Sequence, residues 1–206
     1  MIPYIAPKYN GQTVDLLARV NRIFEELIKI APNERSSGIR TTLLALFTSL
    51  ALEHFRAIVI LVESSVATGS AFALFRPLLE SVTRGEWLYL CANDLEHEAF
   101  TRDALRFKSL PQLAAEVDTK SGLGSWLTKY TQSYTHLCDF THGGLLAVGN
   151  RLTAEGSIEP NYKESRIMLL LDNSARMIVL HFAILAKVDG DAGLADRYAA
   201  LLASLL

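Results

Sequence analysis

Apolar residues recur at helical spacing along almost the whole chain, and no segment shows the strict alternation of a half-buried strand. The first predicted helix, residues 13–30, carries Leu16, Val20 and Leu27 on one face. Further helices are predicted from 37 to 63, 70 to 92, 94 onward, 109 to 117, 125 to 150, 161 to 188 and 192 to 206. We therefore expect an all-α protein, an up-and-down bundle of five to seven helices with no sheet.

The chain has 206 residues, which suits one helical domain over 1–206. Within it, residues 1–12 are expected to form an extended N-terminal arm. Half of the residues are hydrophobic and only 20% are charged, more apolar surface than a chain of this length buries alone. The surplus predicts a homodimer, with the apolar helix over 191–206 as a candidate dimer contact.

Charge and cysteine content narrow the partners and the compartment. The net charge of -2 argues against the broad basic surface that DNA binding needs, so no DNA partner is predicted. Two cysteines, Cys91 and Cys138, do not make a disulfide scaffold and indicate reduced thiols in a cytoplasmic protein. The N-terminus lacks the apolar run of a signal peptide, and charges interrupt the apolar stretches 41–62 and 167–186, so no membrane span is predicted.

Three charged residues follow one face of the predicted third helix. Arg76, Glu80 and Arg84 are spaced four apart, with apolar residues on both sides. One interpretation is a partly buried salt-bridge ladder, and the other is an arginine pair that binds a carboxylate or phosphate. In the same helix, Pro77 lacks an N–H group, so an interior position would leave the carbonyl of Ala73 without its helical donor.

The segment 133–144 concentrates polar side chains in an otherwise apolar chain. Asp139 lies three residues from a histidine on either side, so a helix would let both imidazoles approach its carboxylate. Such a carboxylate fixes an imidazole for acid–base work, and the glycines that follow let a ligand or another backbone come close. A purely structural network with a glycine-capped helix end remains the alternative. The candidate residues here are Ser133, His136, Asp139, Thr141 and His142.

A metal site is a further alternative for the carboxylate–histidine pairs. Asp94-x-x-His97 and Asp139-x-x-His142 each place both groups on one helix face. Di-metal helical proteins use glutamate in this spacing, and aspartate has a shorter reach. We therefore predict no metal and no cofactor. The sequence also lacks a Walker loop, a dinucleotide glycine fingerprint, paired zinc ligands and a nucleophile elbow.

The run from Ala73 to Glu80 (ALFRPLLE), together with Trp87 and Thr141-His142-Gly143-Gly144, resembles a bacterial all-helical family of unknown function. This resemblance implies that Arg76, Glu80 and His142 converge on one polar pocket between helices. It implies no reaction.

A more distant resemblance is to the HEPN superfamily, helical dimers that often cut RNA as toxins or defence effectors. Its nucleases carry an arginine a few residues before a histidine on one helix. Here no arginine lies four to six residues before His136 or His142, so Arg76 would have to reach His142 from another helix.

These observations lead to two functional hypotheses. In the first, Arg76 holds a phosphate, Glu80 orients it, His142 transfers protons and Asp139 fixes His142, which describes a HEPN-like effector or toxin acting on RNA or a nucleotide. Four neighbours would add ligand contacts: Arg84, Thr141, His136 and Ser133. In the second hypothesis the protein is a non-enzymatic dimeric binding or assembly module, and the same network only holds helices in register.

Overall fold

The computed structural model describes residues 9–30, 38–65, 67–122, 124–132, 134–158 and 160–205. This part of the chain is all-helical, as predicted, and contains no strand, only an isolated bridge between Leu152 and Ile158. The ten helices are α1 (Gly11–Ile30), α2 (Ile39–Glu63), α3 (Thr68–Leu90), α4 (Asp94–Thr101), α5 (Leu110–Ser121), α6 (Trp126–Thr131), α7 (Tyr134–Thr141), α8 (Leu145–Gly149), α9 (Glu164–Val188) and α10 (Ala192–Ala203).

The predicted number of five to seven helices is wrong, since the described residues form ten. The largest difference lies between 125 and 150, where one predicted helix is divided into α6, α7 and α8. Gly143, with φ of 67°, adopts the left-handed conformation that ends α7. Apolar periodicity continues across such a break, so it cannot reveal that the chain changes direction.

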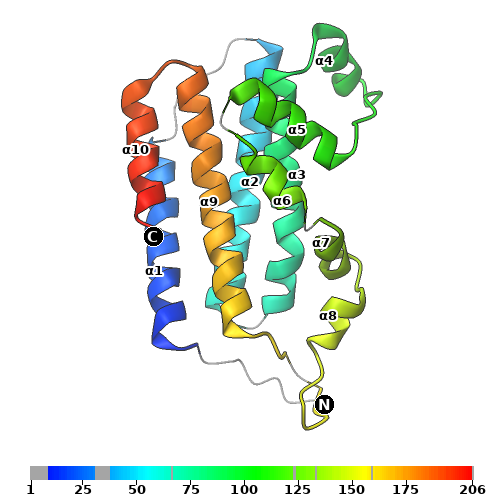
Figure 1. The fold of residues 1–206 in the computed structure, drawn as a ribbon, viewed down its shortest axis with the longest axis vertical. Coiled ribbons are helices and arrows are strands. Elements are labelled where there is room, and N and C mark those ends of the chain that lie inside the picture. The colour runs from blue at the N-terminus through cyan, green and yellow to red at the C-terminus, as the bar shows by residue number, and fades with distance from the viewer. Residues whose placement is uncertain are drawn as a thin grey trace.

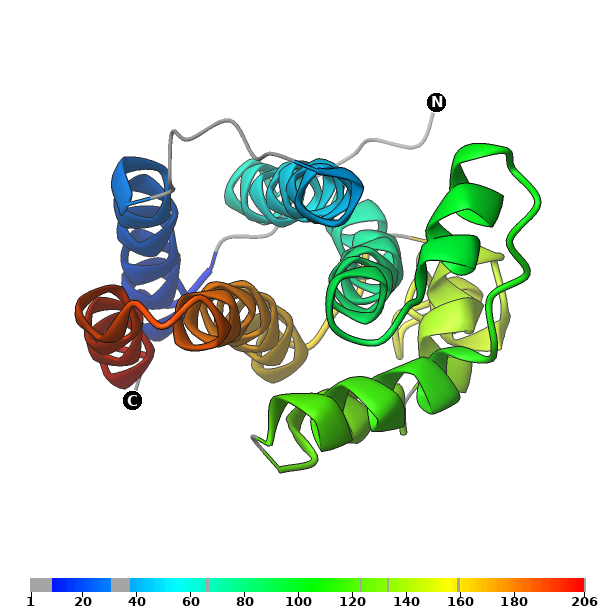
Figure 2. The same ribbon diagram turned by 90° about the horizontal axis from the view of Figure 1, so that it is seen from above.

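The long helices α1, α2, α3 and α9 run alongside one another, the shorter α10 packs beside α9, and helices α4 to α8 cover one side of α3 (Figure 1). Seen from above, α1, α9 and α10 gather at one end of the molecule and α4 to α8 at the other, with α2 and α3 between them (Figure 2). α3 therefore lies between the long-helix layer and the short helices, where its residues contact both.

The most extensive helix pair is α2 with α3, and a glycine lets the two approach closely. A Cβ placed on Gly85 of α3 would lie 2.7 Å from the Cβ of Phe47 of α2. The buried face of α2 includes Phe55 and Ile58, which are fully buried in the core. The predicted stripe on α1 is also buried, from Leu16 to Leu27.

By length and composition alone, α2 and α9 are apolar enough to cross a membrane, which is also true of many core helices. In α9 most of the apolar window, 61%, is buried within the fold, whereas in α2 only 28% is buried. The exposed side of α2 carries Leu46, Leu50 and Ile60, which are 62%, 40% and 47% exposed. α2 therefore presents an apolar face that the described residues do not cover.

Cys91 and Cys138 are free thiols, in agreement with the prediction. Most of the predicted N-terminal arm, residues 1–8, lies outside the described residues. α1 begins within the predicted arm, at Gly11, because the Asn10 side chain accepts a hydrogen bond from the Thr13 backbone and caps the helix.

Candidate functional site

The charged row on α3 forms a continuous set of ion pairs. Arg76 Nε lies 2.8 Å from Glu80 Oε1, and Arg84 Nη2 lies 3.0 Å from Glu80 Oε2. The Glu80 side chain is only 17% exposed, so both guanidinium groups approach a largely desolvated carboxylate. Arg84 also lies over the ring of Phe107, 5.1 Å from its centroid. Both interpretations of the sequence started from this row of charged residues. The two distances fit a salt-bridge ladder in which Glu80 holds both arginines in fixed positions.

Pro77 lies inside α3 and explains where α7 attaches. Because proline has no N–H, the carbonyl of Ala73 loses its usual helical donor. The hydroxyl of Thr141 on α7 lies 3.4 Å from this carbonyl and 3.2 Å from the carbonyl of Leu137 in its own helix. The proline therefore leaves an acceptor on α3, and a hydroxyl from the last turn of α7 reaches it.

The end of α7 fixes the position of His142. The His142 N–H donates to the carbonyl of Cys138, and the Gly144 N–H donates to the carbonyl of Asp139 at 2.7 Å. With Gly143 in the left-handed conformation, this is the glycine-terminated helix end in which the last carbonyls stay paired. His142 is thus the last residue before the chain turns, and its side chain is exposed.

Arg76 and His142 meet, although 66 residues separate them in sequence. Arg76 Nη1 lies 2.8 Å from His142 Nε2. A guanidinium can only donate, so Nε2 must be the acceptor and the imidazole in this arrangement is neutral, with its proton on Nδ1. The contact brings together Arg76, Glu80, Arg84, Thr141 and His142 where α7 packs on α3.

Asp139 does not join this group. In the described part of the chain it has no hydrogen bond or ion pair to His142, so the predicted orienting pair does not form. A Cβ on Gly144 would lie 2.6 Å from Asp139 Oδ1, which shows that the carboxylate lies against this glycine instead. The chain turns after His142 and folds back on α7, so that Gly144 packs against the carboxylate of Asp139. Ser133 and the side chain of His136 lie outside the described residues.

The chemistry available here is anion binding combined with proton transfer. Two guanidinium groups supply positive charge, and a neutral imidazole at the surface supplies an acceptor. Among the described residues, no group of three or more histidine, cysteine, aspartate or glutamate side chains is arranged to hold a metal ion. His97, one candidate ligand, is buried and bonds the Leu88 carbonyl through Nε2 at 2.7 Å.

Sequence reasoning missed a buried acid–base pair between α3 and α9. Glu86 of α3 and His181 of α9 are fully buried, with Glu86 Oε1 2.8 Å from His181 Nδ1. His181 Nε2 lies 2.9 Å from the hydroxyl of Thr48 on α2. Burial raises the pKa of Glu86, and the hydrogen bond from His181 opposes this increase only in part. The apolar surroundings of His181 in the sequence are typical of a histidine in a packing network, whereas Glu86 follows Gly85 without any pattern that would predict its burial.

A family model described as a family of unknown function, DUF6988, matches residues 48–204. The match includes α3, α7 and α9, and so covers every residue of the candidate site. No curated protein and no solved structure gives a significant match to the chain.

Proposed function

Because the chain belongs to the DUF6988 family, whose function is unknown, we propose a function from its site: the protein is a HEPN-like effector that acts on RNA or a nucleotide in bacterial defence or stress. The observation that carries this proposal is the 2.8 Å contact between Arg76 and His142. HEPN nucleases place an arginine and a histidine together on one helix. Here two helices supply the same two side chains.

The proposed chemistry needs only these groups. A phosphate entering the site takes N–H donors of Arg76, and His142 Nε2 then accepts the proton of a ribose 2′-hydroxyl. The 2′-oxygen bonds to phosphorus, the bond to the 5′-oxygen breaks, and the imidazolium returns the proton to that oxygen. The guanidinium stabilises the charge that grows on the phosphate oxygens. Glu80 holds Arg76 through Nε, so the remaining edge of the guanidinium keeps a fixed direction.

The experiment is incubation of the purified protein with total RNA in the presence of EDTA. Loss of a general base lowers rates by about 10²- to 10⁴-fold, so His142→Ala should leave RNA uncut over times at which the unchanged protein degrades it. His54→Ala, a histidine substitution on α2, is the matched control and should cut normally. Intact RNA with the unchanged protein, or equal cutting by His142→Ala, would reject the proposal.

A second candidate function follows from the exposed apolar face of α2. Leu46, Leu50 and Ile60 lie on one side of this helix, and a second copy of the chain could bury them in a homodimer. In that assembly module the Arg76–His142 contact would only hold α7 on α3. Sedimentation of the unchanged chain against Leu46→Lys tests the dimer, because a charge at this position should give a monomer.

The two functions make opposite predictions for the same variant. If the network is structural, His142→Ala should lower the melting temperature by several degrees and change no activity. If it is catalytic, the same variant should keep its melting temperature, because the lost side chain is exposed, and lose RNA cleavage.

A further inference from the structure

A cavity of about 750 Å³ opens between α3, α9 and the short helices α6 to α8. Its size falls within the range of about 300–1,000 Å³ that is usual for small-molecule sites. Five aromatic residues line it: Phe72, Phe75, Trp126, Tyr130 and Phe140. None of Arg76, Glu80, Arg84 or His142 does, so the cavity is separate from the site described above.

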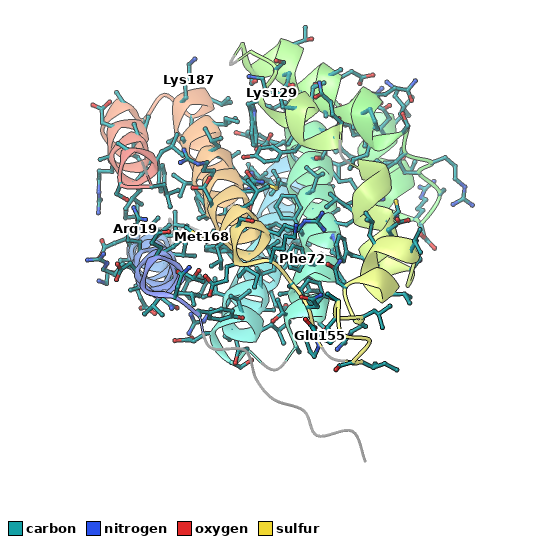
Figure 3. All side chains as sticks on the ribbon, turned by 60° about the horizontal axis from the view of Figure 1, so that its bottom comes forward. Arg19, Phe72, Lys129, Glu155, Met168 and Lys187 are labelled. Atoms are coloured by element: carbon teal, nitrogen blue, oxygen red, sulfur yellow. The ribbon has the colours of Figure 1, made fainter. Side chains whose placement is uncertain are left out.

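The aromatic rings are held by contacts with one another. The rings of Phe72 and Phe140 stack with centroids 5.0 Å apart and an interplanar angle of 22°. Trp126 packs edge-on against Tyr130, at 6.3 Å and 81°. Figure 3 shows Phe72 in the interior, between α9 and the segment of α7 and α8. Rings held in this way form a preformed apolar wall for a planar ligand.

Two cations line the same cavity. Lys129 of α6 and Arg166 of α9 are both exposed, and neither has an ion-pair partner among the described residues. Figure 3 labels Lys129 at the outside of the molecule. Asn173 of α9 adds an uncharged amide to the lining. The cavity therefore combines an apolar interior with positive charge that no described carboxylate neutralises.

We propose that this cavity binds a small aromatic organic acid, with its ring system against the aromatic wall and its acid group toward Lys129 and Arg166. The aromatic lining favours a ring system, and the two cations of the lining, which have no ion-pair partner among the described residues, favour an acid group over a neutral one. The proposal is independent of the RNA-directed function, because the two sites share no residue.

The test compares two fluorescent probes that differ in charge. Anilinonaphthalene sulfonate carries an acid group, and N-phenyl-1-naphthylamine has the same rings without it. Each exposed ion pair contributes up to about fivefold in affinity, so with two cations the sulfonate should bind about 2- to 25-fold more tightly than the neutral probe. Lys129→Ala with Arg166→Ala should remove this difference and leave binding of the neutral probe unchanged.

Three controls separate the cavity from other apolar surfaces. Lys187→Ala removes an exposed cation from α9 that does not line the cavity, and should leave both affinities unchanged. Leu169→Glu places a negative charge on the lining, at a side chain 58% exposed and so tolerant of change, and should weaken sulfonate binding by up to about fivefold while leaving binding of the neutral probe unchanged. Leu46→Lys alters the apolar face of α2 and should have no effect.

Equal affinity for the two probes would overturn the proposal. So would a sulfonate affinity that is unchanged by Leu169→Glu, or that falls equally in Leu46→Lys. Probe binding that weakens as protein concentration rises would assign the cavity to a second copy of the chain, and would also overturn it.

Discussion

The buried pair of Glu86 and His181 gives the fold a pH dependence whose sign can be worked out. Burial raises the pKa of Glu86 above the ordinary value of 4.5, so the folded chain retains this proton at pH values where the unfolded chain has released it. The contribution of Glu86 to the free energy of unfolding is therefore complete below pH 4.5. It is lost as the pH rises through the pKa that Glu86 has in the folded chain. The neutral isostere Glu86→Gln has no such dependence.

The magnitude follows from the linkage relation. Above pH 4.5, the unchanged chain should lose about 1.4 kcal/mol of its free energy of unfolding per pH unit relative to Glu86→Gln. The loss should continue until the pH reaches the pKa of Glu86 in the folded chain. For a chain of about this length, 1 kcal/mol shifts the melting temperature by about 2–4 °C. The two melting curves should therefore separate by about 3–5 °C per pH unit.

The assay is circular dichroism melting at half-unit steps from pH 4 to pH 8. Glu53→Gln, on the exposed side of α2, is the matched control and should run parallel to the unchanged chain throughout. A constant gap between Glu86→Gln and the unchanged chain across this range would refute the reasoning, because it would mean that Glu86 ionises alike in both states.

Three further predictions concern packing and attachment, each measured as the free energy of unfolding in urea. Gly85→Ala should destabilise by about 1–2 kcal/mol, because its Cβ would lie 2.7 Å from that of Phe47, and an unchanged midpoint would contradict this. Asp118→Ala should cost about 2 kcal/mol or more, since this buried carboxylate accepts three hydrogen bonds from the start of α6, and hydrogen exchange should accelerate there first. Thr141→Val should cost about 1 kcal/mol and speed exchange in α7, and full protection of α7 would argue against its attachment through the carbonyl of Ala73.

The sequence predicted the helical class and the row on α3 because both depend on local spacing. Arg76, Glu80 and Arg84 are four residues apart, and a helix of any tertiary arrangement brings them together. In the segment 125–150, the glycines at 143 and 144 allowed for a helix end, and α7 does end there, whereas nothing in the apolar periodicity predicted the separation of α6 from α7.

The partners of His142 depend on contacts between helices, which local spacing does not determine. Asp139 is near in sequence, yet the left-handed turn at Gly143 carries the chain back over its carboxylate. Arg76 is distant in sequence, yet it reaches the imidazole. Glu86 could not be recognised from local spacing either. Nothing in the sequence around it predicts that its carboxyl group is fully buried.

The proline in α3 has a consequence for how this arrangement could change over evolution. Each helical turn advances the axis by about 5.4 Å, so a proline moved by four positions would expose a different acceptor and draw the α7 hydroxyl toward it. The imidazole would then lie roughly a turn away from the guanidinium at 76, beyond hydrogen-bond range. Insertions before α7 can be absorbed by the loops, whereas a shift of residue 77 would separate the two groups.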